Sequence, residues 1–448
     1  MVAIPRLEDY DVFLEKGFLP DQLPLVKLPQ DYYQPWENLV NNLPSLILTK
    51  RVRKLVDDLP SLSTEHLSNR DEYRRAYQCL TFMAQGYVWS ETNPTDKLPE
   101  NIAKPLLEVS DYLGLPPLAT YAGLCLWNYK EIIPGQKFSL DNLTTINTFT
   151  GSIDESWFYL VSVYFEYEGA SCIKLGLDLI NLINNDADRK TIIAHLQELA
   201  ESIDHLGSVL LKMEEMCDPH VFYFRIRPFL AGWKGMNDLG LNKDGVLYGN
   251  ETTPRNYVGG SNAQSSLIQF LDILLSVQHH PTGERPVPHQ ANSMPSAVSN
   301  SSSSSNFMNE MRDYMPEKHR NFLKVLEQVS NIREYVSTNG EDDAELILCY
   351  DACLAMLKSF RDKHIQIVTR YIVLQARQKA KMGSNTMRSG LAKKGITEKG
   401  TGGTSLLPFL KQCRDETGDP AAGNWGKRIL SDGVMRLKYS KPNGINEE

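Results

Sequence analysis

The sequence contains no long hydrophobic run. Among its 448 residues, an apolar stretch such as Trp157–Val163 is far shorter than the roughly 20 residues that a membrane-crossing helix needs. The residues that follow Met1 include acids and lack an apolar segment, unlike a secretory signal peptide. We therefore expect a protein with no membrane span and no secretory signal.

Cysteine is scarce and scattered. The seven cysteines are odd in number, and no two of them form a Cys-x-x-Cys pair. This distribution argues against a disulfide framework and against a structural zinc site. It favours a reduced, cytoplasmic protein.

Positive charge is not in excess. The chain has 47 Lys and Arg against 55 Asp and Glu, a formal net charge of −8, so nucleic acid is not an expected partner. Hydrophobic residues make up 42% and charged residues 23% of the chain, which is typical of a globular protein. That apolar content excludes disorder of the whole chain.

Several catalytic motifs are absent. The sequence has no Gly-x-Ser-x-Gly elbow, no His-Glu-x-x-His pair and no phosphate-binding Gly-x-x-x-x-Gly-Lys-[Ser/Thr] loop. No histidine follows a glutamate by three residues, which argues against a di-iron bundle. These absences argue against the reaction classes that those motifs carry. Reactions that depend on a cofactor bound in another way stay open.

The sequence does contain apolar residues at helical spacing. Stripes with steps of three and four predict helices within Thr191–Met213, Ser265–Val277, Phe322–Val336 and Cys353–Tyr371. Alternation of period two is rare, so we predict an all-α fold. The length suggests two or three domains, and the Thr- and Asn-rich stretch 142–151 is typical of a connector. We place a small N-terminal helical domain at 1–145 and a large helical domain at 152–448.

Two segments interrupt this pattern. Residues 279–308 are rich in proline and include the serine run Ser301–Ser305, which predicts a disordered insertion. Residues 376–404 are basic and rich in glycine, as in a mobile lid loop. Both segments are also compatible with ordinary surface loops.

His364 is the most informative single residue, because it lies on an apolar stripe between Phe360 and Ile367. One interpretation is a core histidine satisfied by a hydrogen bond. The other is a single imidazole ligand to the iron of a large apolar cofactor, haem.

Two further segments suggest ligand binding. Arg227 lies in the aromatic run Phe222–Trp233, where a buried guanidinium would suit a flat ligand that carries a carboxylate. The alternative is a cation whose head reaches solvent from an aromatic helix. The small residues of Gly259–Ser266 would let the backbone approach a ligand closely or would simply cap the next helix.

Taken together and in their order along the chain, these segments resemble those of the indoleamine 2,3-dioxygenase family of haem enzymes. The resemblance spans roughly residues 20–415 and implies an all-α fold with a small N-terminal domain and a large haem-binding domain. The segments that carry it are Leu115–Tyr121, Phe158–Ser162, Arg227–Gly235, Gly259–Ser266, Arg361–Thr369 and Gly400–Thr404.

For the cofactor, haem b, the resemblance implies four residues. His364 matches the proximal ligand of the iron. Arg361 and Asp272 match a network at one propionate, and Ser261 matches a contact of the other.

For the substrate, the resemblance implies catalytic and binding residues. Arg227 matches the arginine that binds the substrate carboxylate, and Ser162 matches the distal hydroxyl near bound dioxygen. The aromatic walls around the indole correspond to Phe222, Tyr121 and Phe158, and Thr401 matches a threonine of the lid. We expect Ser162, Arg227 and Phe222 to be the catalytic set.

The implied reaction is cleavage of the indole C2–C3 bond of L-tryptophan by O2 to give N-formyl-L-kynurenine, the first step of the kynurenine route to NAD. The family also implies a monomer. Two alternatives stay open on the sequence: a haem-based O2 carrier or sensor on the same fold, and a helical interaction protein without haem.

Overall fold

The computed structural model describes residues 4–285, 306–381, 390–392, 400–401 and 405–432. The structure is 62% helix and 3% strand, which confirms the predicted all-α class. None of its described helices combines the length and the apolarity that crossing a bilayer requires.

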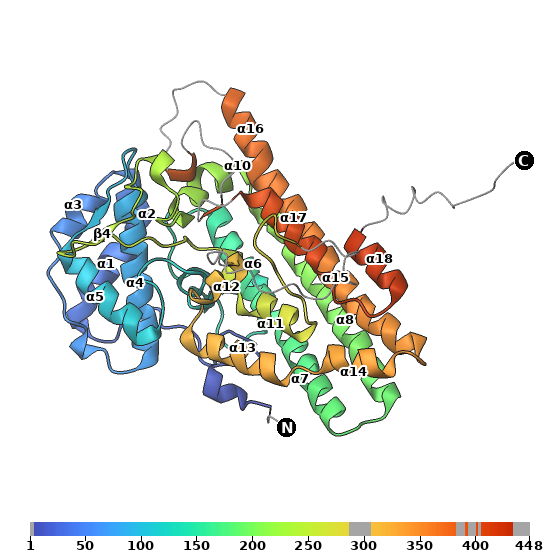
Figure 1. Ribbon diagram of the computed structural model, residues 1–448. Coiled ribbons are helices and arrows are strands. Elements are labelled where there is room, and N and C mark those ends of the chain that lie inside the picture. Colours follow the sequence, from blue (N-terminus) through green and yellow to red (C-terminus); the bar gives the residue numbers. More distant parts are fainter. Residues whose placement is uncertain (1–3, 286–305, 382–389, 393–399, 402–404, 433–448) are drawn as a thin grey trace, which may run out of the picture.

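Five helices form a group at one end of the molecule, drawn in blue in Figure 1. The central one, α4, begins after Asn69, whose side chain accepts from the amides of Asp71 and Glu72 as an N-cap. Buried side chains line most of its length, because the neighbouring helices pack around it. The helices of this N-terminal lobe are α1 (Gln34–Asn41), α2 (Leu43–Leu48), α3 (Val52–Asp57), α4 (Arg70–Trp89) and α5 (Glu100–Leu113).

The other helices fill the rest of the molecule (Figure 1). They are α6 (Ile153–Glu168), α7 (Ala170–Asn184), α8 (Arg189–Leu211), α9 (Met213–Met216), α10 (Pro219–Val221), α11 (Ser266–Leu274), α12 (Phe307–Arg312), α13 (Glu317–Val329), α14 (Ile332–Asn339), α15 (Ala344–Val368), α16 (Leu374–Lys381), α17 (Leu406–Glu416) and α18 (Asn424–Asp432).

The longest of these, α8 and α15, pack along each other, as Figure 1 shows. An aspartate caps the start of each: Asp188 accepts from the amide of Thr191, and Asp343 accepts from the amides of Glu345 and Leu346. The stripe predicted for Thr191–Met213 is confirmed as the buried face of α8. This pairing gives His364, near the end of α15, a rigid support.

The stripe Phe322–Val336 is not one helix, as its spacing had predicted, but two. Helix α13 ends at Val329 and α14 begins at Ile332. Between them the backbone of Ser330 is extended, and its hydroxyl donates to the carbonyl of Leu274 at 3.3 Å. Both helices keep their apolar side chains in the core, so the stripe continues across the break.

The strands among the described residues are short and form two pairs. β1 (Lys97–Leu98) pairs in parallel with β4 (Leu247–Tyr248), and β2 (Lys130–Glu131) pairs antiparallel with β3 (Leu143–Thr144). The first pair holds β4 against the N-terminal lobe, although it is distant in sequence (Figure 1).

Buried apolar residues form two large clusters. The first surrounds α4 and extends to Trp233 and Tyr248, and the second lies among α7, α8, α11, α13 and α15. Residues Leu7, Val12 and Phe18 belong to the second cluster, not to the N-terminal lobe. The division at 145–152 therefore remains a prediction, and both clusters include residues from either side of it.

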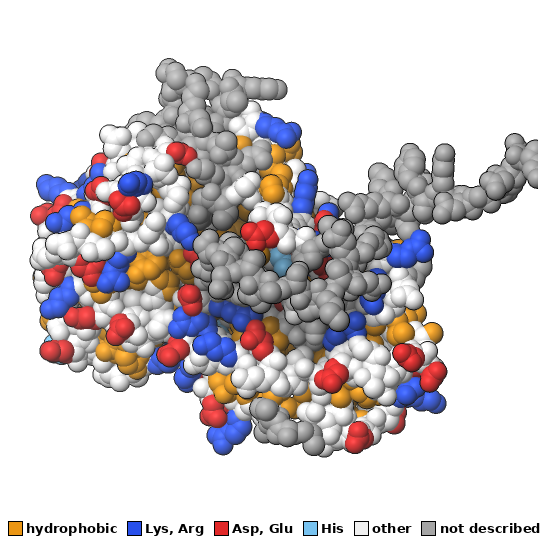
Figure 2. Space-filling view, viewed as in Figure 1, with side chains coloured by type: hydrophobic (Ala, Val, Ile, Leu, Met, Phe, Trp, Pro, Cys, Tyr) orange, Lys and Arg blue, Asp and Glu red, His pale blue; other side chains and the backbone are white. Residues whose placement is uncertain are grey.

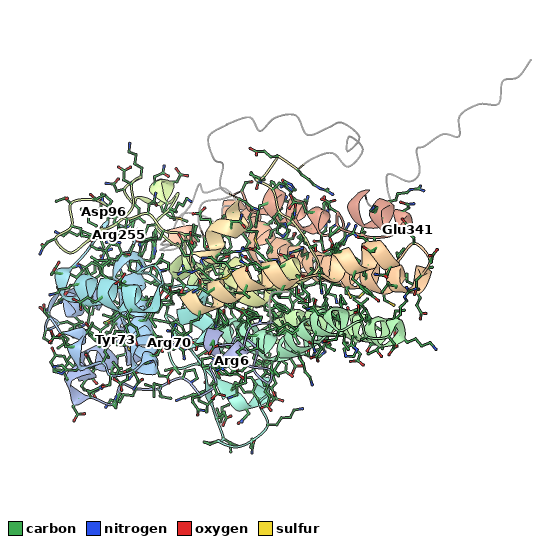
Figure 3. The ribbon with its side chains drawn as sticks, turned by 60° about the horizontal axis from the view of Figure 1, so that its bottom comes forward. Arg6, Arg70, Tyr73, Asp96, Arg255 and Glu341 are labelled. Carbon is green, nitrogen blue, oxygen red and sulfur yellow. The ribbon has the colours of Figure 1, made fainter. Side chains whose placement is uncertain are left out.

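Asp11 links three parts of the chain. Its carboxylate forms ion pairs with Arg70 and Arg74 of α4 at 3.2 and 2.9 Å and with Lys318 of α13 at 2.8 Å. Figure 3 shows Arg70 on the side of the N-terminal lobe nearest to the segment that carries Arg6. The pairing is largely buried at Arg74, and these partners hold the pKa of Asp11 below its usual range against the effect of burial.

The connector 142–151 ends at α6. Glu155, which is fully buried, accepts from the amides of Phe149 and Thr150, each at 2.7 Å. A carboxylate satisfied by backbone donors fixes the direction in which the chain enters α6. This helix then carries Phe158, Ser162 and Glu166 along one face.

The two irregular segments are partly described. Of 279–308, residues 286–305 lie outside the described residues, whereas the side chains of His279 and Arg285 bond to α17 and Asp419. Of 376–404, residues 382–389, 393–399 and 402–404 lie outside them, and residues 376–381 continue the helix α16. Figure 2 shows acidic and basic side chains interspersed over the described part of one face.

Candidate functional site

An apolar cavity of about 250 Å³ lies among α6, α15, α17 and the loops that precede α11 and α17. Nine of the ten residues predicted for the site line it. They are Tyr121, Phe158, Ser162, Phe222, Arg227, Ser261, Arg361, His364 and Thr401. The tenth, Asp272, lies behind Arg361 and bonds to it.

Three π-helical turns border this cavity. They are η4 (Ala122–Leu126), η6 (Phe222–Ile226) and η11 (Thr369–Val373), and each supplies lining residues. Such turns add a residue to a helical turn and occur frequently at functional sites, because they redirect side chains. Spacing at 3.6 residues per turn could not have predicted them.

His364 presents a neutral imidazole to the cavity. Burial, with a smaller contribution from the charge of Arg361, lowers its pKa to about 4. The imidazole makes no hydrogen bond with any residue that the structure describes. A core histidine would be satisfied by such a bond, so the geometry favours the interpretation as a ligand.

Arg361 lies one turn before His364 and is held by Asp272. Its guanidinium donates to both carboxylate oxygens of Asp272 at 2.6 and 2.7 Å, and it also donates to the hydroxyl of Thr417. Although burial alone would raise the pKa of Asp272, the charges of Arg361 and His279 keep it lowered. The pair is thus an ionised, buried anchor at the cavity wall.

Sequence reasoning missed His279, which it placed in the irregular segment. Its ring bonds to Asp272 at 3.1 Å and to Glu416 at 2.7 Å. Although burial would lower the pKa of His279, the charge of Asp272 and the hydrogen bonds around it raise the pKa to about 11. His279, Cys413 and Glu416 lie close enough to hold a metal ion, but a protonated ring between two carboxylates is better described as part of a charge network.

Arg227 is buried at the start of the turn η7 (Arg227–Leu230). Its guanidinium donates to the carbonyl of Leu391 at 3.3 Å and lies 5.2 Å from the ring centre of Tyr223. Burial lowers its pKa to about 10, so it remains a cation at neutral pH. Its head does not reach solvent, which argues against the alternative interpretation of this arginine.

The aromatic side chains form one contiguous wall. The ring of Phe222 lies 4.9 Å from Phe158 and 5.7 Å from Tyr371, both in edge-to-face contact. These rings come from η6, α6 and η11. A planar aromatic ligand could contact both ring faces and ring edges of this wall.

Thr401 joins two cavity loops through its backbone. Its carbonyl accepts from the amides of Gly232 at 3.1 Å and Gly259 at 3.4 Å. A Cβ on Gly232 would lie 2.2 Å from the amide nitrogen of Gly259, so only glycine permits this approach. The segment 259–266 is therefore built for close backbone contact, and Ser261 also caps the short turn η9 (Asn262–Gln264).

Ser162 lies on α6 one turn after Phe158, to whose carbonyl its hydroxyl donates at 3.3 Å. Two further residues hold the wall here: Glu166, which sequence reasoning missed, and Gln264 of the segment 259–266. Glu166 accepts from the hydroxyl groups of Tyr121 and Ser265, and Gln264 accepts from the amide of Tyr121 at 2.9 Å. The position of Glu166, four residues after Ser162 on the same helix face, is the signal that could have indicated it.

The cavity thus defines a class of protein: an all-helical chain with one neutral imidazole, a buried arginine and an aromatic wall around one apolar space. The described lining contains no Asp or Glu and no second histidine. A cofactor of the haem type would fit this donor set, because His364 could supply the single imidazole for its iron and Arg361 could pair with one of its carboxylates.

Comparison with known proteins identifies the family. The family model for indoleamine 2,3-dioxygenase matches residues 6–420. The chain is 48% identical to indoleamine 2,3-dioxygenase of Saccharomyces cerevisiae, over 93% of this chain and 94% of the yeast protein. It is 35% identical to indoleamine 2,3-dioxygenase 2 of Homo sapiens (93% and 95%) and 34% identical to 6-hydroxytryptophan 2,3-dioxygenase of Fusarium equiseti (92% and 96%). The chain belongs to the indoleamine 2,3-dioxygenase family, a family of oxidoreductases of the dioxygenase type.

Proposed function

We propose that this protein is a haem b dioxygenase that cleaves the indole C2–C3 bond of L-tryptophan with O2 to give N-formyl-L-kynurenine. The observation that carries the proposal is the placement of His364 and Arg227 on one apolar cavity with an aromatic wall. The relatives named above supply the reaction class.

His364 would be the ligand of the iron, because a neutral imidazole without a partner among the described residues is ready to coordinate. Arg361, with Asp272 behind it, would hold one propionate, and Ser261 would contact the other. Haem, when bound, supplies the binding and activation of O2.

Arg227 would bind the substrate carboxylate by charge-assisted hydrogen bonds. Phe158, Phe222 and Tyr121 would hold the indole, and Thr401 would close the end of the site at the amino acid. Ser162 would place its hydroxyl near the oxygen side of the ring. The described lining offers no carboxylate or second histidine as a base, so positioning carries much of the catalysis that the protein contributes.

The deciding experiment is aerobic turnover of L-tryptophan by the haem-loaded, ascorbate-reduced protein, followed by the near-ultraviolet absorbance of N-formylkynurenine. We expect product to form. A normal spectrum of the ferrous protein with O2 but no product would contradict the proposal and favour an O2 carrier or sensor. A purified protein that takes up no haem would favour a helical interaction protein.

We further propose that the enzyme catalyses the first step from tryptophan toward kynurenine and NAD, and that it works as a cytoplasmic monomer. The odd, scattered and buried cysteines support a reducing compartment. Elution of the purified protein at the mass of one chain in light scattering tests the monomer.

A further inference from the structure

Glu166 is a fully buried carboxyl group directly behind the cavity wall. It lies on α6 and is 0% exposed. One oxygen, Oε1, accepts from the hydroxyl of Tyr121 at 3.0 Å and from that of Ser265 at 2.6 Å. Both donors line the cavity, whereas Glu166 itself does not.

The other oxygen, Oε2, has no hydrogen-bond partner among the described residues. Leaving a buried carboxylate half-satisfied is costly, because the charged form loses water and gains too few donors. The carbonyl of a neutral acid can still accept both bonds on Oε1. The arrangement therefore matches the protonated acid better than the carboxylate.

Two titratable groups face Glu166: the phenol of Tyr121, the residue just before η4, and the thiol of Cys125 within η4. From the loop before α11 it meets only the hydroxyl of Ser265. No charged side chain of the described residues contributes to its pKa. Burial raises that pKa to about 7, and the two hydrogen bonds oppose the rise only in part.

Hydrogen bonds hold both the backbone amide and the hydroxyl of Tyr121. Its amide donates to Gln264, whose own side chain donates to the carbonyl of Gly259 at 2.9 Å. Its hydroxyl donates to Glu166, since the other acceptor, the carbonyl of Ser162, lies at 3.5 Å. The position of the ring is thus coupled to the segment that carries Ser261.

We propose that Glu166 is a positioning residue of this cavity: through Oε1 it fixes Tyr121 and Ser265, and on ionisation it holds them more tightly, because hydrogen bonds to a carboxylate are stronger than those to a neutral acid. The inference rests on the proposed function, because it assigns Tyr121 to the wall that holds the indole. The working enzyme then gains affinity for its substrate as pH rises through neutrality, because Tyr121 is held more firmly in the wall.

The test compares the wild type with Glu166→Gln, which keeps a carbonyl acceptor and cannot ionise. We expect the KM for L-tryptophan in the wild type to fall roughly threefold or more between about pH 6 and about pH 8.5, while that of E166Q does not fall over the same range. Glu168→Gln, an exchange at a half-buried residue on the same helix that bonds to His205, should retain the wild-type profile. A fall in E166Q equal to that of the wild type, or no fall in the wild type, would overturn the proposal.

A second readout needs no turnover. Infrared difference spectra of the substrate-free protein between about pH 6 and about pH 8.5 should show loss of a carboxylic acid C=O stretch, which is absent from E166Q. Ser265→Ala removes a bond that favours the ionised form, so it should move the midpoint to higher pH, and it serves if E166Q does not fold. No such band in the wild type would overturn the proposal. Absence of tryptophan turnover with this band present would contradict the proposed function alone.

Discussion

His364 shows how a single side chain can be assigned by its lack of partners. A buried imidazole that no described residue satisfies is a site for a ligand, and its lowered pKa keeps it neutral over the physiological range. The same cavity holds a cation, Arg227, that remains charged. His364 is thus suited to coordinate a metal ion, and Arg227 is suited to bind an anion.

His364→Ala should abolish stable haem binding, because the described lining contains no second histidine that could replace it. The measurement is the Soret absorbance per mole of purified protein, with circular dichroism to show that the fold is intact. His205→Ala, at an exposed site on α8, is the matched control and should keep full haem content. Full haem content in H364A would refute the assignment.

Arg227→Ala should raise the KM for L-tryptophan roughly tenfold to hundredfold, since a charge-assisted hydrogen bond contributes about 1.5–3 kcal/mol. Haem content should not change. Arg225→Ala removes an exposed arginine of the preceding turn, η6, and should leave the KM as it is. Unchanged kinetics in R227A would remove Arg227 from the site.

At the scale of elements, apolar stripes with side-chain caps explain long helices such as α4, α8 and α15, whereas the breaks between helices depend on packing. Helices α8 and α15 follow from stripes that the sequence displays, with aspartate caps at their starts. The break between α13 and α14 does not, because an uninterrupted stripe gives no sign of it. The π-helical turns likewise arise where side chains must point into the cavity.

Helix α13 also makes a pH-dependent contact with the N-terminal segment. His319 is buried, its ring lies 4.9 Å from that of Phe18, and its hydrogen bond to Ser266 is long, at 3.4 Å. Burial lowers its pKa to about 3, although Asp11 opposes this shift and Arg74 and Arg70 assist it.

Because the unfolded chain then binds more protons than the native one between about pH 6.5 and about pH 3, the free energy of unfolding should fall as pH is lowered through that range. His319→Phe should reduce this slope in urea titrations at several pH values. His195→Phe, a half-buried histidine at the edge of the α8 stripe, is the control and should keep it. An unchanged slope in H319F would show that other groups govern the acid response.

At the scale of the whole molecule, the N-terminal lobe supports the segment that carries Arg227. Gln85 of α4, which is fully buried, donates to the carbonyls of Phe229 and Ala231, each at 3.0 Å. Trp89 donates to the carbonyl of Ala231 at 3.1 Å. The lobe therefore acts on the site although it supplies few lining residues.

Gln85→Leu should remove the side-chain donor of the carbonyl of Phe229 and leave that of Ala231 with Trp89 alone. It should cost about 1–3 kcal/mol in the free energy of unfolding and raise the KM for L-tryptophan. Asn101→Leu is a matched control, because the amide of Asn101 also donates to two carbonyls, those of Val56 and Leu59, within the lobe alone. It should cost stability without a change in KM. Equal effects of both variants on KM would show that the lobe does not position the site.

The sequence by itself determined the helical class and the main stripes, and its family resemblance named ten site residues. Nine of these line the cavity, and the tenth, Asp272, bonds to Arg361 behind it. These properties depend on local spacing and on short segments, which a linear chain displays directly. Only the tertiary structure decided which groups are buried together: Glu166 with Tyr121 and Ser265, His279 between Asp272 and Glu416, and Gln85 beneath the segment of Arg227. The reason is physical, because the charge and the partners of a side chain depend on residues far along the chain that packing brings within hydrogen-bond distance.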